Sequence, residues 1–284
     1  MLTPALIDPV VRAALAEDAP WGDLTGELLV PAEATATAGL VAREPGTLAG
    51  IDVFAAAFTL TDPSVQVVPR TADGDRFAAG EVLAEVTGPA RAVLQAERVA
   101  LNLLQRMCAT ATLTAALVAA VEGTGARITD TRKTTPGLRV LERHAVRCGG
   151  GVNHRFSLSD GVMAKDNHLA VLARSGIGVE EALRAARARL GHMVRLEVEV
   201  DRLDQIEPVL AGGADVIMLD NFSLADLRAG VALIAGRAVV EASGTITLDT
   251  VRDVALTGVD VISSGALTHS AGSLDLGLDM DVRA

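Results

Sequence analysis

The chain has 284 residues, half of them hydrophobic, and carries a formal net charge of -11. A chain of this length can bury one large core or two smaller ones, whereas its negative charge disfavours a nucleic-acid-binding surface. No apolar run approaches the roughly 18 residues that a membrane span needs, and the N-terminal segment lacks a basic stretch followed by an apolar one. We therefore expect a cytoplasmic protein that has no cleaved leader and binds neither membranes nor nucleic acid.

Cysteine and lysine are both rare in this sequence. The two cysteines, Cys108 and Cys148, form no CxxC pair and have no metal-ligand spacing, so we expect each to be a small buried side chain. Of 25 basic residues, only Lys133 and Lys165 are lysines. Because arginine fills every other basic position, these two sites are candidates for roles that need a compact ammonium group.

Residues 1–110 predict an N-terminal α+β domain. Short β-like segments punctuated by glycines lie within residues 35–49 and 65–86, and two helical patterns follow them. Residues 73–88 have the glycine rhythm of a lipoyl-type hairpin, but a carrier of that type needs a lysine at the hairpin tip and neither lysine lies there. We expect this segment to be a β-turn scaffold.

Residues 111–270 predict a parallel α/β barrel domain. Short apolar runs alternate with amphipathic stretches, which is typical of βα units, and about six such units favour a closed barrel over an open sheet. The expected strands are residues 126–129, 161–164, 194–200, 216–219, 238–241 and 259–263. The expected helices are residues 179–190, 203–210, 224–234 and 247–256, with Ser223 and Thr247 as N-caps of the last two.

Polar side chains concentrate at the ends of these apolar runs. The carboxyl ends of the strands of a parallel barrel form one rim, and that rim carries the chemistry. Between Arg127 and His168 there are eight basic and four acidic residues, a net charge of +4 in an acidic chain. This local charge predicts a site for a small anion, with a solvated basic helix face as the alternative.

Two motifs in this basic segment suit anion binding. Residues 130–133 (DTRK) place a carboxylate, a guanidinium and an ammonium directly after a strand. A guanidinium binds a carboxylate through two parallel hydrogen bonds, whereas an ammonium suits phosphate. Residues 149–151 (GGG) let the backbone approach a ligand closely, and residues 153–155 (NHR) add donors. Each motif alone also fits an ordinary loop.

Acidic residues at two later strand ends are candidate Mg²⁺ ligands. Residues 197–201 (EVEVD) place Glu197, Glu199 and Asp201 on one face of a strand, and Asp220 ends the next strand. Mg²⁺ prefers a few carboxylates together with substrate phosphate oxygens. We therefore expect Glu199 and Asp220 to hold Mg²⁺, directly or through water, with ordinary salt bridges as the alternative.

Two small-residue loops are candidate phosphate sites. Residues 241–245 (EASGT) and 263–270 (SSGALTHS) each lie between a strand and an expected helix. Backbone amides at a helix start bind phosphate, and the late βα loops of a barrel commonly hold such a group. The predicted rim thus suits a diacid together with a phosphorylated sugar.

The segment from Asp130 to His168, DTRKTTPGLRVLERHAVRCGGGVNHRFSLSDGVMAKDNH, resembles the signature region of the quinolinate phosphoribosyltransferase family. Other segments resemble the family in the same order along nearly the whole chain: EDAPWGDLT (17–25), AERVALNLLQR (96–106), EVEVD (197–201), MLDNF (218–222), EASG (241–244) and GALTHS (265–270). The sequence departs from the usual pattern at Gly26, where Thr or Ser is more common, and at Thr245, where a second glycine is common.

This resemblance implies a type II phosphoribosyltransferase fold: an N-terminal α+β domain beside an incomplete parallel α/β barrel, with residues 271–284 returning to the first domain. It implies decarboxylating transfer of a phosphoribosyl group from phosphoribosyl pyrophosphate to quinolinate, which yields nicotinate mononucleotide, pyrophosphate and CO₂ for NAD biosynthesis. It also implies a homodimer, or a higher oligomer, whose active site is shared between subunits.

By position, the resemblance gives Arg98 as the arginine supplied by the neighbouring subunit. The residues implied for the quinolinate carboxylates are Arg132, His154, Arg155 and Lys165. Those implied for phosphoribosyl pyrophosphate and its Mg²⁺ are Lys133, Glu199 and Asp220, which with Lys165 form the expected catalytic group. Those implied for the 5-phosphate are Ser243, Gly244, Gly265 and His269.

Three other functions remain open at this point. The same fold could act on a different substrate, as in relatives encoded near molybdate transporters, although the NHR and KDNH segments favour quinolinate. Lys165 could instead form a Schiff base at a strand end, but no other residue selects a carbonyl substrate. The last alternative is a non-catalytic binding or carrier module.

Overall fold

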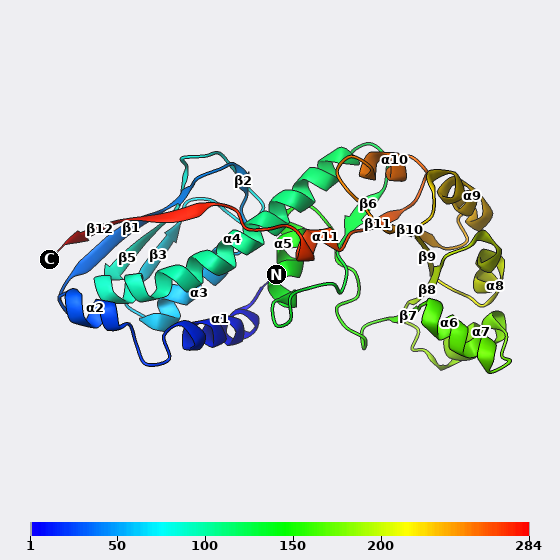
Figure 1. The fold of residues 1–284 in the computed structure, drawn as a ribbon, viewed down its shortest axis with the longest axis horizontal. Helices are drawn as coiled ribbons and strands as arrows, with labels where there is room; N and C mark the ends of the chain where they lie inside the picture. Colours follow the sequence, from blue (N-terminus) through cyan, green and yellow to red (C-terminus); the bar gives the residue numbers. More distant parts are fainter. Residues whose placement is uncertain (1, 284) are drawn as a thin grey trace. The chain divides into compact units, whose positions relative to one another are not determined.

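The computed structural model describes residues 2–283, which form two compact units (Figure 1). Within the described residues, the first unit is built from three separate segments, residues 2–115, 134–150 and 267–283. The second unit is built from residues 116–133 and 151–266.

An antiparallel sheet forms the body of the first unit. Its strand order is β12 (Leu276–Arg283), β1 (Thr35–Ala42), β5 (Val82–Pro89) and β3 (Gln66–Pro69). Every second residue of β1 is buried, from Ala36 to Ala42, because successive side chains of a strand point to opposite faces. The other elements of the unit are β2 (Gly46–Thr47), β4 (Arg76–Phe77), α1 (Pro4–Asp18), α2 (Leu24–Leu29), α3 (Ile51–Thr61), α5 (Arg139–Cys148) and α11 (Ala266–His269).

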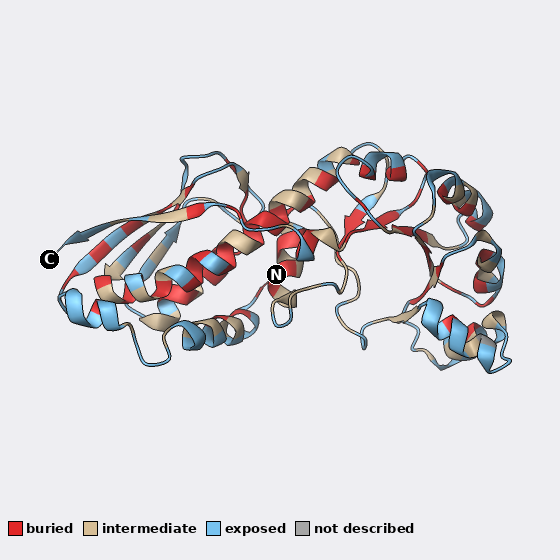
Figure 2. Cartoon of the chain, in the orientation of Figure 1, coloured by how far each residue is buried: buried red, intermediate tan, exposed pale blue. Residues whose placement is uncertain are grey.

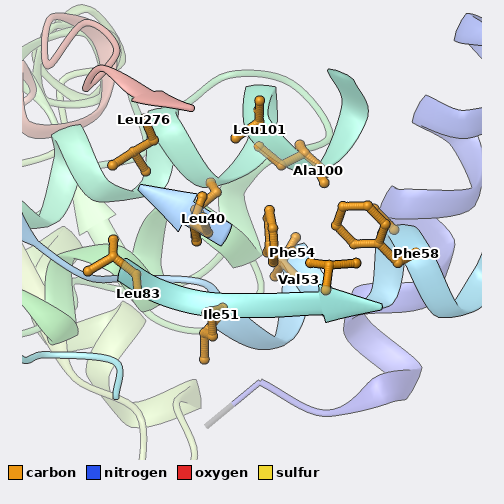
Figure 3. Close-up of a cluster of buried hydrophobic side chains, with 14 of the residues drawn as sticks. Leu40, Ile51, Val53, Phe54, Phe58, Leu83, Ala100, Leu101 and Leu276 are labelled. Atoms are coloured by element: carbon orange, nitrogen blue, oxygen red, sulfur yellow. The ribbon is translucent and has the colours of Figure 1, made fainter. Parts of the chain in front are cut away.

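Apolar side chains from helices and strands form the core of the first unit (Figure 3). Phe54 and Phe58 lie one turn apart on α3, and their rings meet edge to face with centroids 5.0 Å apart. Leu40 and Leu83 of the sheet are fully buried beside them, and burying each such side chain contributes about 1.5–3 kcal/mol. Leu276 of β12 belongs to the same cluster, so the last strand is part of this core.

The long helix α4 (Ala90–Ala120) supplies many of these core residues. Among the described residues, it is the one helix whose length and composition would let it cross a membrane, and half of that apolar stretch is buried inside the fold. Its buried face includes Ala100, Leu104 and Met107, all members of the core cluster. The apolar character of α4 is thus accounted for by its place in the core.

A six-stranded parallel sheet forms the centre of the second unit. Its order is β6 (Arg127–Thr129), β11 (Val261–Ser263), β10 (Val239–Ser243), β9 (Val216–Asp220), β8 (Leu196–Val200) and β7 (Val162–Ala164). The outer helices are α6 (Asp166–Arg174), α7 (Val179–Arg189), α8 (Ile206–Ala211), α9 (Leu224–Ile234) and α10 (Val251–Ala255). The strands follow an arc with these helices on its outer side (Figure 1), and the strands are the more buried layer (Figure 2).

The barrel is incomplete because its two end strands do not pair. Beyond β6, Val152 forms a single parallel bridge with Thr129, and at the other end β7 pairs only with β8. This arrangement confirms the expected fold class of an α+β domain followed by an incomplete parallel α/β barrel. All six strands lie where the apolar runs predicted them.

Two expectations about the elements need correction. Ser223 does cap α9, since its Oγ accepts the N–H of Asp226 at 3.2 Å. Thr247 does not cap α10, which begins at Val251 after Thr250. Residues 134–150, expected in the barrel domain, belong to the first unit, whereas the segment after residue 270 pairs with β1 through β12.

Candidate functional site

The carboxyl ends of the parallel strands enclose a cavity of about 350 Å³ in the second unit. Parallel strands bring their ends to one rim, so residues far apart in the sequence become neighbours there. The predicted site residues that line this cavity are Arg132, Lys133, His154, Arg155, Lys165, Glu199, Asp220 and Ser243. The other lining residues are Thr131, Met163, Met218, Glu241 and Ser263.

A guanidinium pair gives one part of this cavity its positive charge. Arg132 and Arg155 both line it, and Arg155 donates from Nη1 to the carbonyl oxygen of Gly161 at 2.7 Å. Partial burial and the positive charge of Arg132 together lower the pKa of Arg155. Two arginines held near one another in a cavity form a strong binding site for anions, in particular carboxylates.

His154 is oriented by a buried carboxylate at the end of β6. Asp130 is completely buried, and its two oxygens accept the N–H of His154 at 2.7 Å and the side-chain amide of Asn153 at 2.6 Å. The imidazole Nδ1 accepts the N–H of Arg155 at 2.7 Å. Nε2 therefore carries a proton and faces the carboxylates of the neighbouring strands.

Two buried glutamates surround this face of His154. Its Nε2 lies 3.1 Å from Oε2 of Glu197 and 3.6 Å from Oε2 of Glu241. Burial lowers the pKa of His154, but the hydrogen bond with Glu197 and the charges of Glu197, Glu241 and Asp130 outweigh it and raise this pKa above the ordinary value. Burial and the charge of Glu197 raise the pKa of Glu241 to about 7. The cluster therefore favours a proton on Nε2 of His154, beside the two arginines.

This raised pKa predicts a pH-dependent effect of Glu241→Gln on stability. Between pH 4.5 and about 7, the folded protein keeps a proton on Glu241 that the unfolded chain releases, so stability contributed by this group falls as the pH rises through that window. Gln cannot ionise. We therefore expect the stability of Glu241→Gln relative to the parent, measured as the difference in the free energy of unfolding, to be higher at pH 8 than at pH 5 by about 1–3 kcal/mol.

Urea denaturation at the two pH values measures this difference. The exposed pair Arg237 and Glu207 offers a control, since Glu207→Gln should shift stability little at either pH. An identical effect of Glu241→Gln at both pH values would contradict a proton retained on Glu241 in the folded protein.

Acidic and ammonium groups meet on another part of the cavity. Nζ of Lys165 donates to Oε2 of Glu199 at 2.8 Å, and the backbone N–H of Lys165 donates to Nδ1 of His168 at 3.0 Å. Asp220, at the end of β9, accepts the side-chain amide of Asn221 at 2.7 Å. Glu199 and Asp220 thus line the same cavity as Lys165, as expected. Asp201 does not line it and instead lies beside Arg202 at the surface.

A second hollow of about 380 Å³ lies between the loops that follow β9 and β10. Ser243 lines both hollows, whereas Gly244 and Thr245 line only this one. Gly244 has a φ of +141°, and a Cβ there would lie 2.9 Å from Oδ1 of Asn221. Glycine is therefore required at 244, whereas the exposed Thr245 side chain meets no such restriction.

The remaining predicted residues do not line the cavity. Gly265 lies between β11 and α11 at the end of the second unit. His269 ends α11 in the first unit, where its Nδ1 lies 2.6 Å from Oγ of Ser270. Arg98 is exposed on α4, also in the first unit. Their assigned roles remain predictions.

Comparison with known proteins decides the family. A family model described as the C-terminal domain of quinolinate phosphoribosyl transferase matches residues 110–279, and the model of the N-terminal domain matches residues 23–108. The chain belongs to the quinolinate phosphoribosyl transferase family. This result favours quinolinate over the alternative substrates of the same fold.

Relatives and solved structures agree with this family over nearly the full chain. A probable nicotinate-nucleotide pyrophosphorylase (carboxylating) of Bacillus subtilis is 45% identical over 93% of this chain and 90% of its own length. The enzyme of that name from Mycobacterium leprae is 44% identical over 95% of both chains. The crystal structure of NadC from Streptococcus pyogenes has a TM-score of 0.93 at 42% identity and covers 100% of this chain and 99% of its own.

Three residues that line the cavity of this quinolinate phosphoribosyl transferase family member were not predicted from the sequence: Met163, Met218 and Glu241. A simple signal was available, because side chains of a strand share a face when they are two residues apart. Met163 precedes Lys165, Met218 precedes Asp220, and Glu241 precedes Ser243 by two positions, and all of these residues line the cavity. The positions two residues before each polar strand end were therefore predictable.

Proposed function

We propose that this chain catalyses decarboxylating phosphoribosyl transfer from phosphoribosyl pyrophosphate to quinolinate, forming nicotinate mononucleotide, pyrophosphate and CO₂ in NAD biosynthesis. The observation that carries this proposal is the single cavity that two arginines and His154 line together with the Lys165–Glu199 pair and Asp220. Such a cavity suits a small diacid together with a pyrophosphate ester.

The reaction follows from the charges of these residues. Arg132, His154, Arg155 and Lys165 would hold the two carboxylates of quinolinate, which places the pyridine nitrogen against C1 of the ribose. The nitrogen–C1 bond forms as the C1–oxygen bond to pyrophosphate breaks, and Lys133 would stabilise the departing charge. The bond between the ring carbon next to the nitrogen and its carboxylate group then breaks, and CO₂ leaves. The cationic ring nitrogen stabilises the electron pair left on the ring carbon until that carbon takes a proton from solvent.

Glu199 and Asp220 are the residues that would hold Mg²⁺. Both are carboxylates that line the cavity, and this donor set fits an ion that takes a few carboxylates and completes its shell with water and phosphate oxygens. The ion would neutralise charge on the pyrophosphate. Lys165, already paired with Glu199, would keep that carboxylate oriented toward the cavity.

The 5-phosphate of the sugar would lie at the loops after β10 and β11. Ser243 and Gly244 offer a hydroxyl and a close backbone approach, whereas Gly265 directly precedes α11 and His269 is its last residue. These assignments are supported by the chemistry of small residues at strand ends. Thr245, which follows Gly244, is exposed.

A homodimer with a shared active site is the assembly we propose, in the cytoplasm. Arg98 is exposed on the surface of the first unit rather than engaged in the core, as an arginine supplied to a neighbouring subunit must be. The same unit exposes large apolar side chains around α2, namely Trp21, Leu24, Leu28 and Leu29. Such a patch commonly marks a protein–protein interface.

The direct test of activity is release of CO₂ from carboxyl-labelled quinolinate. We expect release to require both quinolinate and phosphoribosyl pyrophosphate, and to depend on Mg²⁺. Nicotinate, which lacks the second carboxylate, should bind much more weakly in a titration. Turnover of another ring acid with no turnover of quinolinate would overturn the proposed substrate.

Mixing two inactive variants tests the shared site. In an Arg98→Ala homodimer, every site lacks the arginine from the neighbouring subunit. In a Lys133→Ala homodimer, every site lacks the lysine of its own subunit, so both homodimers should be inactive. After subunit exchange, half of the dimers are mixed, and each of these has one intact site, so activity should return to about a quarter of the parent value. No recovery, despite mixed dimers shown by native mass spectrometry, would mean that Arg98 does not act across subunits, and an Arg98→Ala variant that remains active would place Arg98 outside the site.

A further inference from the structure

A second group of reactive side chains lies in the first unit, away from the residues used above. Asp73 comes from the loop between β3 and β4, and His144 and Cys148 come from α5. The two α5 residues are four positions apart, so they lie on the same face of the helix. All three line a surface hollow of about 770 Å³ in that unit.

The three donor atoms face one another. Nε2 of His144 lies 2.6 Å from Oδ2 of Asp73 and 3.3 Å from Sγ of Cys148. All three donor atoms lie within 4.8 Å of one another. In a tetrahedral zinc site, bonds of about 2.0–2.3 Å place neighbouring donor atoms roughly 3.3–3.6 Å apart. The distance between Sγ of Cys148 and Nε2 of His144 already fits. Oδ2 of Asp73 would have to move away from Nε2 by well under 1 Å.

Asp73 is held in place for this role by its other oxygen. Oδ1 accepts the backbone N–H groups of Gly50 and Ile51, at 2.8 and 3.0 Å, where α3 begins. Burial raises the pKa of Asp73, but the bond from His144 and these two amides outweigh burial and keep this pKa below the ordinary value. The carboxylate is thus ionised, and its Oδ2 is directed at His144. Partners of this kind orient the ligands of natural metal sites.

We propose that Asp73, His144 and Cys148 form a binding site for a zinc-class divalent cation, separate from the Mg²⁺ expected at Glu199 and Asp220. One oxygen, one imidazole nitrogen and one sulfur are a donor set that selects zinc and similar ions over magnesium. The fourth position would open to the hollow and take water. Binding forms metal bonds to sulfur and to Nε2 of His144. The thiol proton leaves to solvent, and the proton that Nε2 shares with Asp73 moves to Nδ1 of the ring or leaves to solvent.

The alternative interpretation is that these three side chains form only a structural hydrogen-bond cluster, which holds α5 against the loop that contains Asp73. Burial and the charge of Asp73 raise the pKa of Cys148 to about 12, so the thiol is neutral while no cation is present. A structural cluster of this kind would keep its thiol in the presence of metal, whereas the proposed site would convert it to a thiolate ligand.

Cobalt(II) distinguishes the two interpretations because thiolate ligation adds a near-ultraviolet charge-transfer band to its spectrum. We expect the purified full-length protein, freed of metal with a chelator, to bind one equivalent of cobalt with this band and to lose it on addition of zinc. Zinc should also raise the melting temperature, because it binds only the folded state. The other described group of this kind, His154 with Glu197 and Glu241, contains no sulfur.

Three variants locate the site. Cys148→Ser removes the sulfur with little change in size, and Asp73→Asn keeps an oxygen for the amides of α3 while replacing the ligand oxygen. We expect the band to vanish in the first, and zinc affinity to fall by about 100-fold or more in the second. Cys108→Ala is the matched control, since Cys108 is the other cysteine and is fully buried.

Circular dichroism and the melting temperature without metal establish that each variant is folded. Cobalt binding without the band, a band that persists in Cys148→Ser, or a band lost only in Cys108→Ala would overturn the proposal. Unchanged zinc affinity in Asp73→Asn would also overturn it.

Discussion

Arg132→Ala is expected to lower kcat/KM for quinolinate by about 100- to 1,000-fold. Arg132 lines the cavity beside Arg155, and a bidentate guanidinium–carboxylate contact in a desolvated site is worth about 2–5 kcal/mol when one partner is removed. Most of the loss should appear in KM for quinolinate, because the contact is made before the transition state as well as within it. Steady-state kinetics with varied quinolinate and saturating phosphoribosyl pyrophosphate measure it.

Arg132→Lys should recover only part of this loss, since an ammonium cannot make two parallel hydrogen bonds. The matched control is Arg195→Ala, because Arg195 is an exposed arginine of the same unit and does not line the cavity. Its kinetics should equal those of the parent. An Arg132→Ala variant that is folded and has an unchanged KM for quinolinate would refute carboxylate binding by this residue.

Glu142→Ala is expected to reduce the free energy of unfolding by about 2–4 kcal/mol. The Glu142 side chain is 1% exposed, and Oε1 accepts two hydrogen bonds from Arg106 at 2.7 and 3.0 Å. Its Oε2 accepts the N–H of Thr135 at 3.1 Å. Removing the carboxylate leaves the guanidinium of Arg106 on α4 without its counter-charge. Because about a third of the Arg106 side chain is exposed, solvation by water limits the loss of stability.

Urea denaturation of the variant measures this loss. Glu180→Ala offers a matched control, because Glu180 forms an exposed pair with Arg184 on one helix. That pair should contribute less than about 0.5 kcal/mol. Equal effects of the two substitutions would mean that the Arg106–Glu142 contact does not hold α5 in the first unit.

This contact also explains why the domain boundary was hard to predict. Residues 134–150 follow the DTRK motif of the barrel and precede its NHR motif, so their place in the sequence favours the barrel. Their place in the structure is decided by side chains distant in sequence: Arg106 binds Glu142, Thr135 and the carbonyl oxygen of Thr268. A pattern of local periodicity carries no information about such pairs.

The strands and the rim of the site were predictable because they follow from local sequence patterns. Runs such as Val216–Asp220 combine an apolar stretch with a polar end, and parallel pairing brings these ends together without further information. The two-residue spacing could have placed Glu241 on the cavity side of β10, but its interaction with Glu197 on β8 depends on the order of the strands, which the sequence does not give. The Cys148 site was missed because its third member, Asp73, lies 71 positions from His144, although the spacing of His144 and Cys148 on one helix was readable.

The order in which the segments of the first unit are made has a consequence for folding during translation. Strand β12 covers one edge of β1 along its whole length, from Thr35 opposite Arg283 to Ala42 opposite Leu276. A ribosome must therefore synthesise the entire second unit before that edge can be covered, and a nascent chain exposes it until then. Unpaired strand edges invite association with other chains. We expect chaperone capture of stalled chains to end only once this closing strand emerges.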